Sequence, residues 1–421
     1  MLKLNNKQVF LYKGAEVIMC VRQYILENWK NTTRDNTGTN LPKPFSTPSI
    51  EPLFANFFYW DTYFINLGLL ADGLAEQAKN NLDNIASFIR RIGYMPTASH
   101  LFNNTQPPLF TCAVFDYWQY SKDDEVLKEY FDAILTEYAF FKRERTTEIG
   151  LAQYGHFDYA DNVVKGIYEY ASKRLDIVKD GEAEQRRFAY NISAIGESGW
   201  DFTPRFASDS ELFVPLDYVQ VELNSLLYDM EKKIAQIYSL IGDNVNSEKF
   251  TEYANQRKRL MEKYMRSDAN GIYYDYNFAE KRFSKLASAA SFYPYVFGVT
   301  DDKTGLINLL KLLELDFGIS ACEDREQSNN LQWDYPIMWA PNVYFAHEAL
   351  RKNGLTDDAE RIAKKYMHVL EENFHKTDRL WEKYNAKTGE IASAKESGAN
   401  PMLGWTGGVY AHFYNRYGSS I

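Results

Sequence analysis

The sequence predicts an all-α protein in which helical hairpins form a ring, an (α/α)6 barrel. Apolar residues recur at helical spacing through most of the 421 residues. The helical segments come in pairs of similar length joined by short turns, and about six such pairs follow one another. Strand patterns are few and short, as around Gly271–Tyr276. Repeated helix pairs of this kind pack helix on helix around a common core.

Individual helices are predicted by apolar residues at helical spacing, and their ends by residues that commonly cap helices. One stripe runs from Leu223 to Ile241 and ends at Gly242, a residue suited to follow a helix. Another begins after Thr356, which we expect to act as an N-cap. The predicted spans are 12–30, 60–73, 75–92, 107–121, 123–144, 217–241, 245–267, 284–295, 302–315, 336–353, 356–374 and 404–417.

The pairs leave one stretch unassigned. Residues 145–212 are too many and too polar for a hairpin turn, so we expect a long loop beside the central cleft. Long loops in compact domains are usually functional. We expect residues 1–421 to form one (α/α)6-barrel domain, with residues 1–50 as a leading segment and first helix.

Composition excludes several kinds of partner and site. The net charge of −10 argues against nucleic acid and anionic membranes, which attract basic surfaces. The histidines form no HxxxH or HxH pattern and the three cysteines are far apart, so we expect no metal and no other cofactor. Residues 1–14 lack a continuous apolar export segment, which predicts a cytoplasmic protein. Oligomeric state stays open.

Aromatic, carboxylate and amide residues gather in five short segments. These are Y-W-D-T-Y-F at 59–64, N-N-T-Q-P-P-L-F at 103–110, E-S-G-W-D-F at 197–202, Q-W-D-Y-P-I-M-W-A-P at 332–341 and K-E-S-G-A-N-P-M-L-G-W-T-G-G-V at 395–409. Rings with a polar handle suit sugar faces and hydroxyls. Glycoside hydrolysis needs two carboxyl groups, one of them a general acid whose pKa is raised by apolar neighbours. Asp201, between Trp200 and Phe202, has neighbours of that kind.

These segments resemble the trehalases, glycoside hydrolase family 37, which are related to family 63. The matching segments follow the family order: F-Y-W-D-T-Y at 58–63, Q-P-P-L at 106–109, the whole of 197–202, the segment from Gln332 to Pro341, E-K-Y at 382–384 and G-W-T-G-G-V at 404–409. The resemblance covers about residues 52–413. It implies an (α/α)6 α-glycosidase that inverts the anomeric configuration.

The resemblance also implies residue roles. Asp201 falls on the general acid, and Glu396, eight residues before Gly404, falls on the general base. Inverting enzymes separate these groups by about 6.5–9.5 Å to admit a water. The same motifs suggest six substrate-binding residues: Trp60, Asp61, Gln106, Trp200, Trp333 and Trp405. Glu197 is a less favoured acid, and Asp334 is as well suited to a structural bond as to substrate.

Several trehalose contacts of the family are missing. Leu53 stands where the family has a sugar-binding arginine, Asn56 replaces a glutamate, and Asn104 replaces another arginine. Neither leucine nor asparagine can replace the forked donor of arginine. The expected substrate is therefore an α-linked glucoside such as trehalose, a related disaccharide or a glucosyl-solute.

Two other functions remain open from the sequence. Sugar epimerases also use helical barrels, but they abstract protons, usually with histidine pairs, and no such pair lies in the five segments. A non-catalytic sugar-binding protein would keep the aromatic residues and could lose either carboxylate. Both carboxylates are present, which favours the hydrolase.

Overall fold

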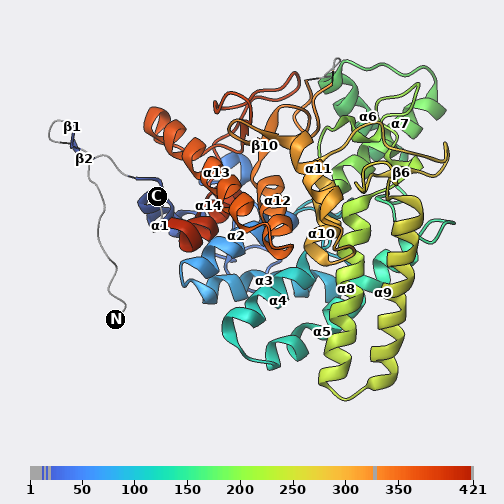
Figure 1. The fold of residues 1–421 in the computed structure, drawn as a ribbon, viewed down its shortest axis with the longest axis horizontal. Helices are drawn as coiled ribbons and strands as arrows, with labels where there is room; N and C mark the ends of the chain where they lie inside the picture. Colours follow the sequence, from blue (N-terminus) through green and yellow to red (C-terminus); the bar gives the residue numbers. More distant parts are fainter. Residues whose placement is uncertain (1–11, 14–15, 18–19, 326–329, 419–421) are drawn as a thin grey trace.

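Six helices of the described chain form a closed inner ring (Figure 1). The computed structural model describes residues 12–13, 16–17, 20–325 and 330–418. Each inner helix contacts the next, and the last contacts the first. Most residues of the inner helices are buried, as expected of helices that are apolar on nearly every side. The ring consists of α2 (Tyr59–Ala71), α4 (Phe110–Ser121), α8 (Val221–Leu240), α10 (Tyr293–Phe297), α12 (Ala340–Lys352) and α14 (Gly404–Tyr417).

The outer layer is amphipathic and packs one face against the ring. Its helices are α1 (Val21–Thr32), α3 (Ala75–Ile92), α5 (Glu125–Glu144), α9 (Asn244–Tyr264), α11 (Lys303–Leu313) and α13 (Thr356–Thr377). Short 3-10 turns lie at Pro52–Phe54, Pro204–Phe206, Pro215–Asp217 and Ala289–Phe292. Alternation of inner and outer helices confirms the predicted all-α class and the (α/α)6 barrel. The first helix is shorter than predicted, since α1 begins at Val21 and part of 12–30 lies outside the described residues.

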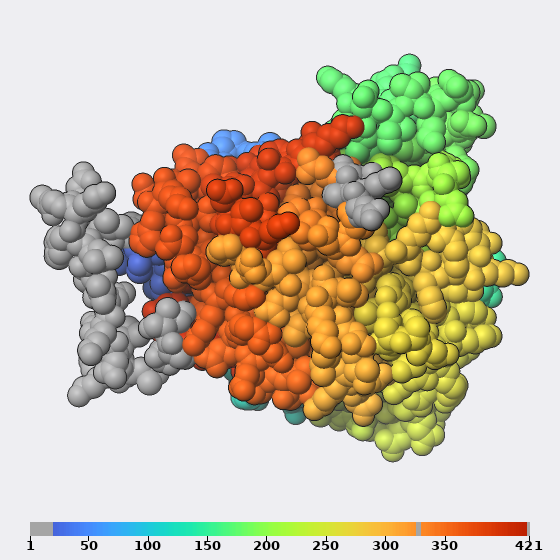
Figure 2. Space-filling view, turned by 45° about the horizontal axis from the view of Figure 1, so that its top comes forward, coloured from blue at the N-terminus to red at the C-terminus, as the bar shows by residue number. Residues whose placement is uncertain are grey.

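The expected long loop at 145–212 is wrong, because it contains a further helix pair. Helices α6 (Asp161–Leu175) and α7 (Glu182–Ser198) pack on each other and project at the upper right of Figure 2, in green. They share a small hydrophobic core that includes Leu175, Phe188 and Phe202. Charged residues between the apolar positions of α6 obscure its helical stripe in the sequence.

The end of α7 explains the Ser-Gly-Trp-Asp order. Gly199 ends the helix at φ 75°, a left-handed conformation that favours glycine. A Cβ atom at this position would lie 2.9 Å from the Trp60 indole. Glycine therefore both reverses the chain and lets Trp200 and Asp201 approach the start of α2.

Strands within the described residues are two or three residues long. Strands β10 (Ile337–Trp339) and β11 (Lys383–Asn385) pair antiparallel and set Trp339 opposite Lys383. This pairing joins two of the sequence motifs. The other strands are β1 (Tyr12–Lys13), β2 (Glu16–Val17), β3 (Thr33–Arg34), β4 (Phe45–Ser46), β5 (Tyr218–Val219), β6 (Tyr276–Asn277), β7 (Arg282–Phe283), β8 (Glu314–Leu315) and β9 (Gly318–Ile319).

A buried charge cluster anchors the segment that follows Asp201. Arg205 is completely buried, and its guanidinium donates to Asp275 at 2.8 Å and to Glu222 at 3.1 Å. Asp275 also accepts from the backbone N–H of Val221, at the start of α8, at 2.9 Å. The cluster therefore fixes the loop after Asp201 to the inner ring.

Replacing Arg205 by Ala is expected to destabilise the protein by about 3–5 kcal/mol, because it leaves two buried carboxylates without their cation. Urea denaturation measures the free energy of unfolding. The matched control is Arg259, an exposed arginine that forms a surface ion pair with Glu252. Its replacement by Ala should change stability by less than about 0.5 kcal/mol. Equal stability of both variants would contradict the anchoring role.

Candidate active site

Five tryptophans from four of the motifs meet at the N-terminal ends of the inner helices. The Trp333 ring stacks on Trp200 at 4.9 Å and on Trp339 at 4.2 Å between centroids. Trp60 lies 5.7 Å from both Trp333 and Trp405. The five side chains are 1–6% exposed, so they form a rigid wall. The structure thus brings together the four tryptophans expected from sequence and adds Trp339.

One glutamine connects the two candidate catalytic segments. The backbone N–H of Gln332 donates to Glu396 Oε1 at 2.7 Å. The side-chain amide of the same residue donates to the backbone carbonyl of Asp201. The Lys383 ammonium donates to Gln332 Oε1 at 3.1 Å. Asp201 and Glu396, 195 residues apart in the chain, are therefore both hydrogen-bonded to one buried residue, Gln332.

Asp201 faces a cavity of about 570 Å³. Burial raises the pKa of its carboxyl group, and the nearby positive charge of Arg174 opposes that rise. A raised pKa keeps a carboxylic acid protonated at higher pH, which suits a proton donor. The cavity wall consists of Thr97, Leu101, Asn103, Asn104, Gln106, Val163, Gly166, Ile167, Tyr170, Ile192, Ser193, Gly196, Asp201 and Phe202.

Glu396 has one oxygen bound and one free. Oε1 accepts the Gln332 N–H, whereas the buried Oε2 has no hydrogen-bond partner among the described residues. Lys383 lies nearby, donating to Ser397 Oγ at 3.1 Å. A carboxylate held by one oxygen and open at the other can accept a proton from a positioned water.

A second pair of acids lies beside the tryptophan wall. Asp61 is 6% exposed, and burial raises its pKa to about 7, with the negative charge of Glu382 adding to the effect. Glu382 accepts from the Asn400 side chain at 3.1 Å. Gln106 accepts from the backbone N–H of Trp60 at 3.2 Å, which orients the start of α2. These groups can accept hydrogen bonds from sugar hydroxyls.

The alternative acid Glu197 and the undecided carboxylate of Asp334 both have structural partners. Glu197 is buried and forms a two-point ion pair with Arg145, at 2.7 and 2.9 Å. Asp334 forms the same kind of pair with Arg325, at 2.6 and 2.8 Å. Both carboxylates are held by guanidinium groups, which leaves Asp201 as the acid that faces the cavity.

Besides Trp339, sequence reasoning missed four residues of the site: Gln332, Glu382, Lys383 and Arg174. The first three stand in or beside motifs that match the family, so their motif position was an available signal. Arg174 belongs to no motif and lies in the stretch 145–212, which the sequence predicts as a loop. Only the presence of helix α6 shows that Arg174 lies beside Tyr170 and Phe202.

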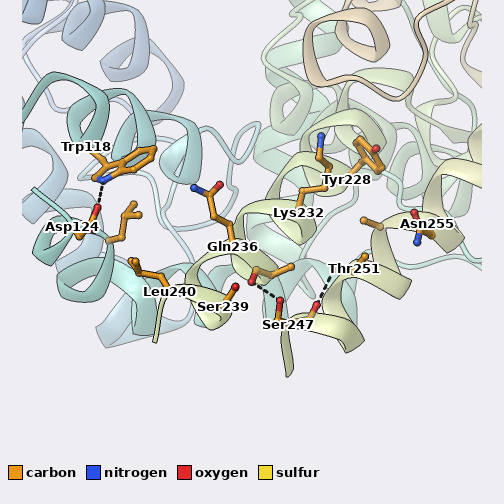
Figure 3. A pocket seen from close by; sticks show the side chains of 13 residues that line it. Trp118, Asp124, Tyr228, Lys232, Gln236, Ser239, Leu240, Ser247, Thr251 and Asn255 are labelled. Carbon is orange, nitrogen blue, oxygen red and sulfur yellow. Dashed lines mark hydrogen bonds between the residues drawn. The ribbon is translucent and has the colours of Figure 1, made fainter. Parts of the chain in front are cut away.

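A different hollow of about 640 Å³ lies at the C-terminal ends of α4 and α8, away from the tryptophan wall. Its labelled side chains are shown in Figure 3. Asp124, the acidic residue among its lining side chains, accepts from Trp118 Nε1 at 2.8 Å. Without a second carboxyl group in its described lining, this hollow does not suit glycoside hydrolysis.

Comparison with known proteins shows which sequences this chain is similar to. A family model described as Trehalase matches residues 17–418. The periplasmic trehalase of Escherichia coli O1:K1 is 27% identical and aligns with 92% of this chain and 73% of its own length. A periplasmic trehalase of Shigella flexneri is 26% identical with the same coverage.

Solved structures share the fold. The neutral trehalase of Saccharomyces cerevisiae superposes with a TM-score of 0.74 at 24% identity, covering 95% of this chain and 82% of that one. The family 63 mannosylglycerate hydrolase of Thermus thermophilus, in complex with Tris and D-glycerate, gives a TM-score of 0.64 at 14% identity, covering 94% and 99%. These likenesses support the barrel architecture.

The relatives correct the predicted location. The cytoplasmic prediction depended on the lack of an apolar export segment, but the similar curated proteins are named periplasmic trehalases, which contradicts it. Export is directed by a targeting segment that is removed, and not by the folded domain, so the composition of the barrel does not indicate where the protein is located. No helix in the described part of the chain has the length and apolar character to cross a bilayer.

Proposed function

Because this chain belongs to the trehalase family of glycoside hydrolases, we propose that it cleaves an α-linked glucoside with inversion, Asp201 acting as general acid and Glu396 as general base. Family membership makes the chain a glycoside hydrolase rather than an epimerase or a binding protein. The observation that carries the assignment is the bridge through Gln332, which sets both carboxyl residues beside one aromatic wall. Trehalose is the first substrate to test, since the curated relatives are trehalases.

The proposed reaction is a single displacement. Glu396 Oε2 takes a proton from water while the water oxygen bonds to the anomeric carbon. The glycosidic C–O bond breaks, and Asp201 gives its proton to the leaving oxygen. Asp61 and Glu382 accept hydroxyl hydrogen bonds of the glucosyl unit, and the tryptophans exclude water from its faces. The wall strengthens these contacts because a dry site lowers the local dielectric constant.

Inversion gives a direct test. We expect the first-formed glucose from an α-glucoside to be the β anomer, because the water attacks the face opposite the leaving group. Proton NMR of the anomeric signals within the first minutes measures it, before mutarotation equilibrates the anomers. A screen should include trehalose, other α-linked disaccharides and glucosyl-solutes. First formation of α-glucose would contradict the role of Glu396, and no turnover of any α-glucoside would contradict the proposed function.

A further inference from the structure

One face of α6 forms part of the cavity wall beside Asp201. Val163, Gly166, Ile167 and Tyr170 all line the cavity. Their spacing of three, four and seven residues places them on a single side of the helix. Arg174 follows Tyr170 by four residues and continues the same side.

Arg174 is held among the aromatic residues of this wall. Its guanidinium carbon lies 5.2 Å from the Phe202 ring centroid and 5.7 Å from that of Tyr170. It also donates a hydrogen bond to the Tyr170 hydroxyl. No carboxylate of the described residues forms an ion pair with Arg174, whereas Arg145, Arg205 and Arg325 near the site each have one. Most of the donor capacity of Arg174 is therefore free for a ligand.

The position of Asp201 identifies which part of the substrate this wall meets. A general acid protonates the leaving oxygen, so the leaving group lies beside Asp201. Asp61, Glu382 and Glu396 do not line this cavity and lie in or beside the segments that carry the tryptophans, where we expect the glucosyl unit to bind. The cavity between Asp201 and the α6 face is thus the aglycone subsite.

The two positions where the trehalase pattern has arginine supply no guanidinium to this cavity. Leu53, at one position where the trehalase pattern has arginine, is apolar and 65% exposed. Asn104, at the second such position, donates its amide to the Ser193 carbonyl at 2.7 Å. The Arg174 guanidinium lies against Tyr170 and Phe202, which line the same cavity as Asn104 and Ser193.

We propose that Arg174 is the specificity-determining residue of the aglycone subsite and donates hydrogen bonds to hydroxyl oxygens of a second sugar or polyol. This inference rests on the proposed hydrolysis of an α-glucoside. Arginine suits the role because its planar fork can donate to two neighbouring oxygens at once. The aromatic rings of Tyr170 and Phe202 hold the fork in place, so little side-chain freedom is lost on binding.

Three substrates separate this role from others. They are trehalose, or the α-linked disaccharide with the highest kcat/KM in the screen, methyl α-glucoside and α-glucosyl fluoride. The methyl glycoside needs the acid as a disaccharide does but has no aglycone hydroxyls. The fluoride requires neither. We expect Arg174→Ala to lower kcat/KM for the disaccharide by about 10–100-fold, the usual cost of a charged hydrogen bond, and to change the other two by less than about twofold. Arg174→Lys should give an intermediate loss.

Lys173→Ala is the matched control, since Lys173 is the exposed neighbour on α6 and loses the same charge. It should leave all three substrates unchanged. If Arg174→Ala lowered kcat/KM equally for the disaccharide and the methyl glycoside, Arg174 would act on the pKa of Asp201 and not on the aglycone, and the proposal would be overturned. An unchanged kcat/KM for the disaccharide would also overturn it. If the unmodified enzyme hydrolyses none of the three substrates, the result contradicts the proposed function itself. That outcome is distinct from those that contradict only the role of Arg174.

Discussion

Replacing Asp201 by Asn is expected to lower kcat/KM for an α-linked disaccharide by about 10²–10⁴-fold, the range for loss of a general acid. Asparagine matches the shape of aspartic acid but has no proton to give to the leaving oxygen. Fluoride leaves without protonation. The same variant should therefore hydrolyse α-glucosyl fluoride within about tenfold of the unmodified rate. Steady-state kinetics with the two substrates measures the difference.

The control for this substitution is Asp209→Asn, eight residues further along the same loop. Asp209 is exposed and pairs with Lys285, so its replacement should leave both rates unchanged. Equal losses of Asp201→Asn on the disaccharide and the fluoride would contradict an acid role. They would point instead to a defect in glucosyl binding or folding.

The pH dependence follows from the same carboxyl group. Burial raises the pKa of Asp201, and the acid must be protonated to act. Disaccharide kcat/KM should therefore fall as the pH rises through that raised pKa, which lies above the ordinary carboxyl range of about 4. Fluoride hydrolysis should lack this alkaline limb, because it does not need the proton.

The ring itself follows from local sequence signals, and the site follows only in part. The inner helix α2 is indicated by its nearly continuous apolar character, and Gly93 and Gly354 mark helix ends with positive φ angles. Helices α6 and α7 were not predicted because their apolar stripes are short and interrupted by charge. Their stability depends on packing against Phe202 and its neighbours, which lie outside both helices.

Contacts distant in sequence account for what the motifs could not show. The role of Glu197 is decided by Arg145, 52 residues away, and that of Asp334 by Arg325. Gln332 contacts Glu396 through its backbone N–H, which every residue except proline has, so residue type gave no signal. The resemblance, by contrast, pointed to Asp201 and Glu396, and the structure places their segments together.

Replacing Glu396 by Ala should abolish turnover of both the disaccharide and α-glucosyl fluoride, each by about 10²–10⁴-fold. Water must lose a proton as it attacks, whichever group leaves. This pattern differs from that of the acid variant, in which the fluoride stays a substrate. The rates of Asp201→Asn and Glu396→Ala on the two substrates therefore distinguish the general acid from the general base.

Added azide should restore turnover of the fluoride by Glu396→Ala, because the anion needs no base and the shorter side chain leaves room for it. Its nitrogen bonds to the anomeric carbon as fluoride leaves. Attack opposite the leaving group yields β-glucosyl azide, which NMR identifies. Glu390→Ala, an exposed glutamate in the segment before Glu396, is the control and should keep full activity without azide. Formation of α-glucosyl azide would show that Glu396 does not direct attack across the sugar from Asp201.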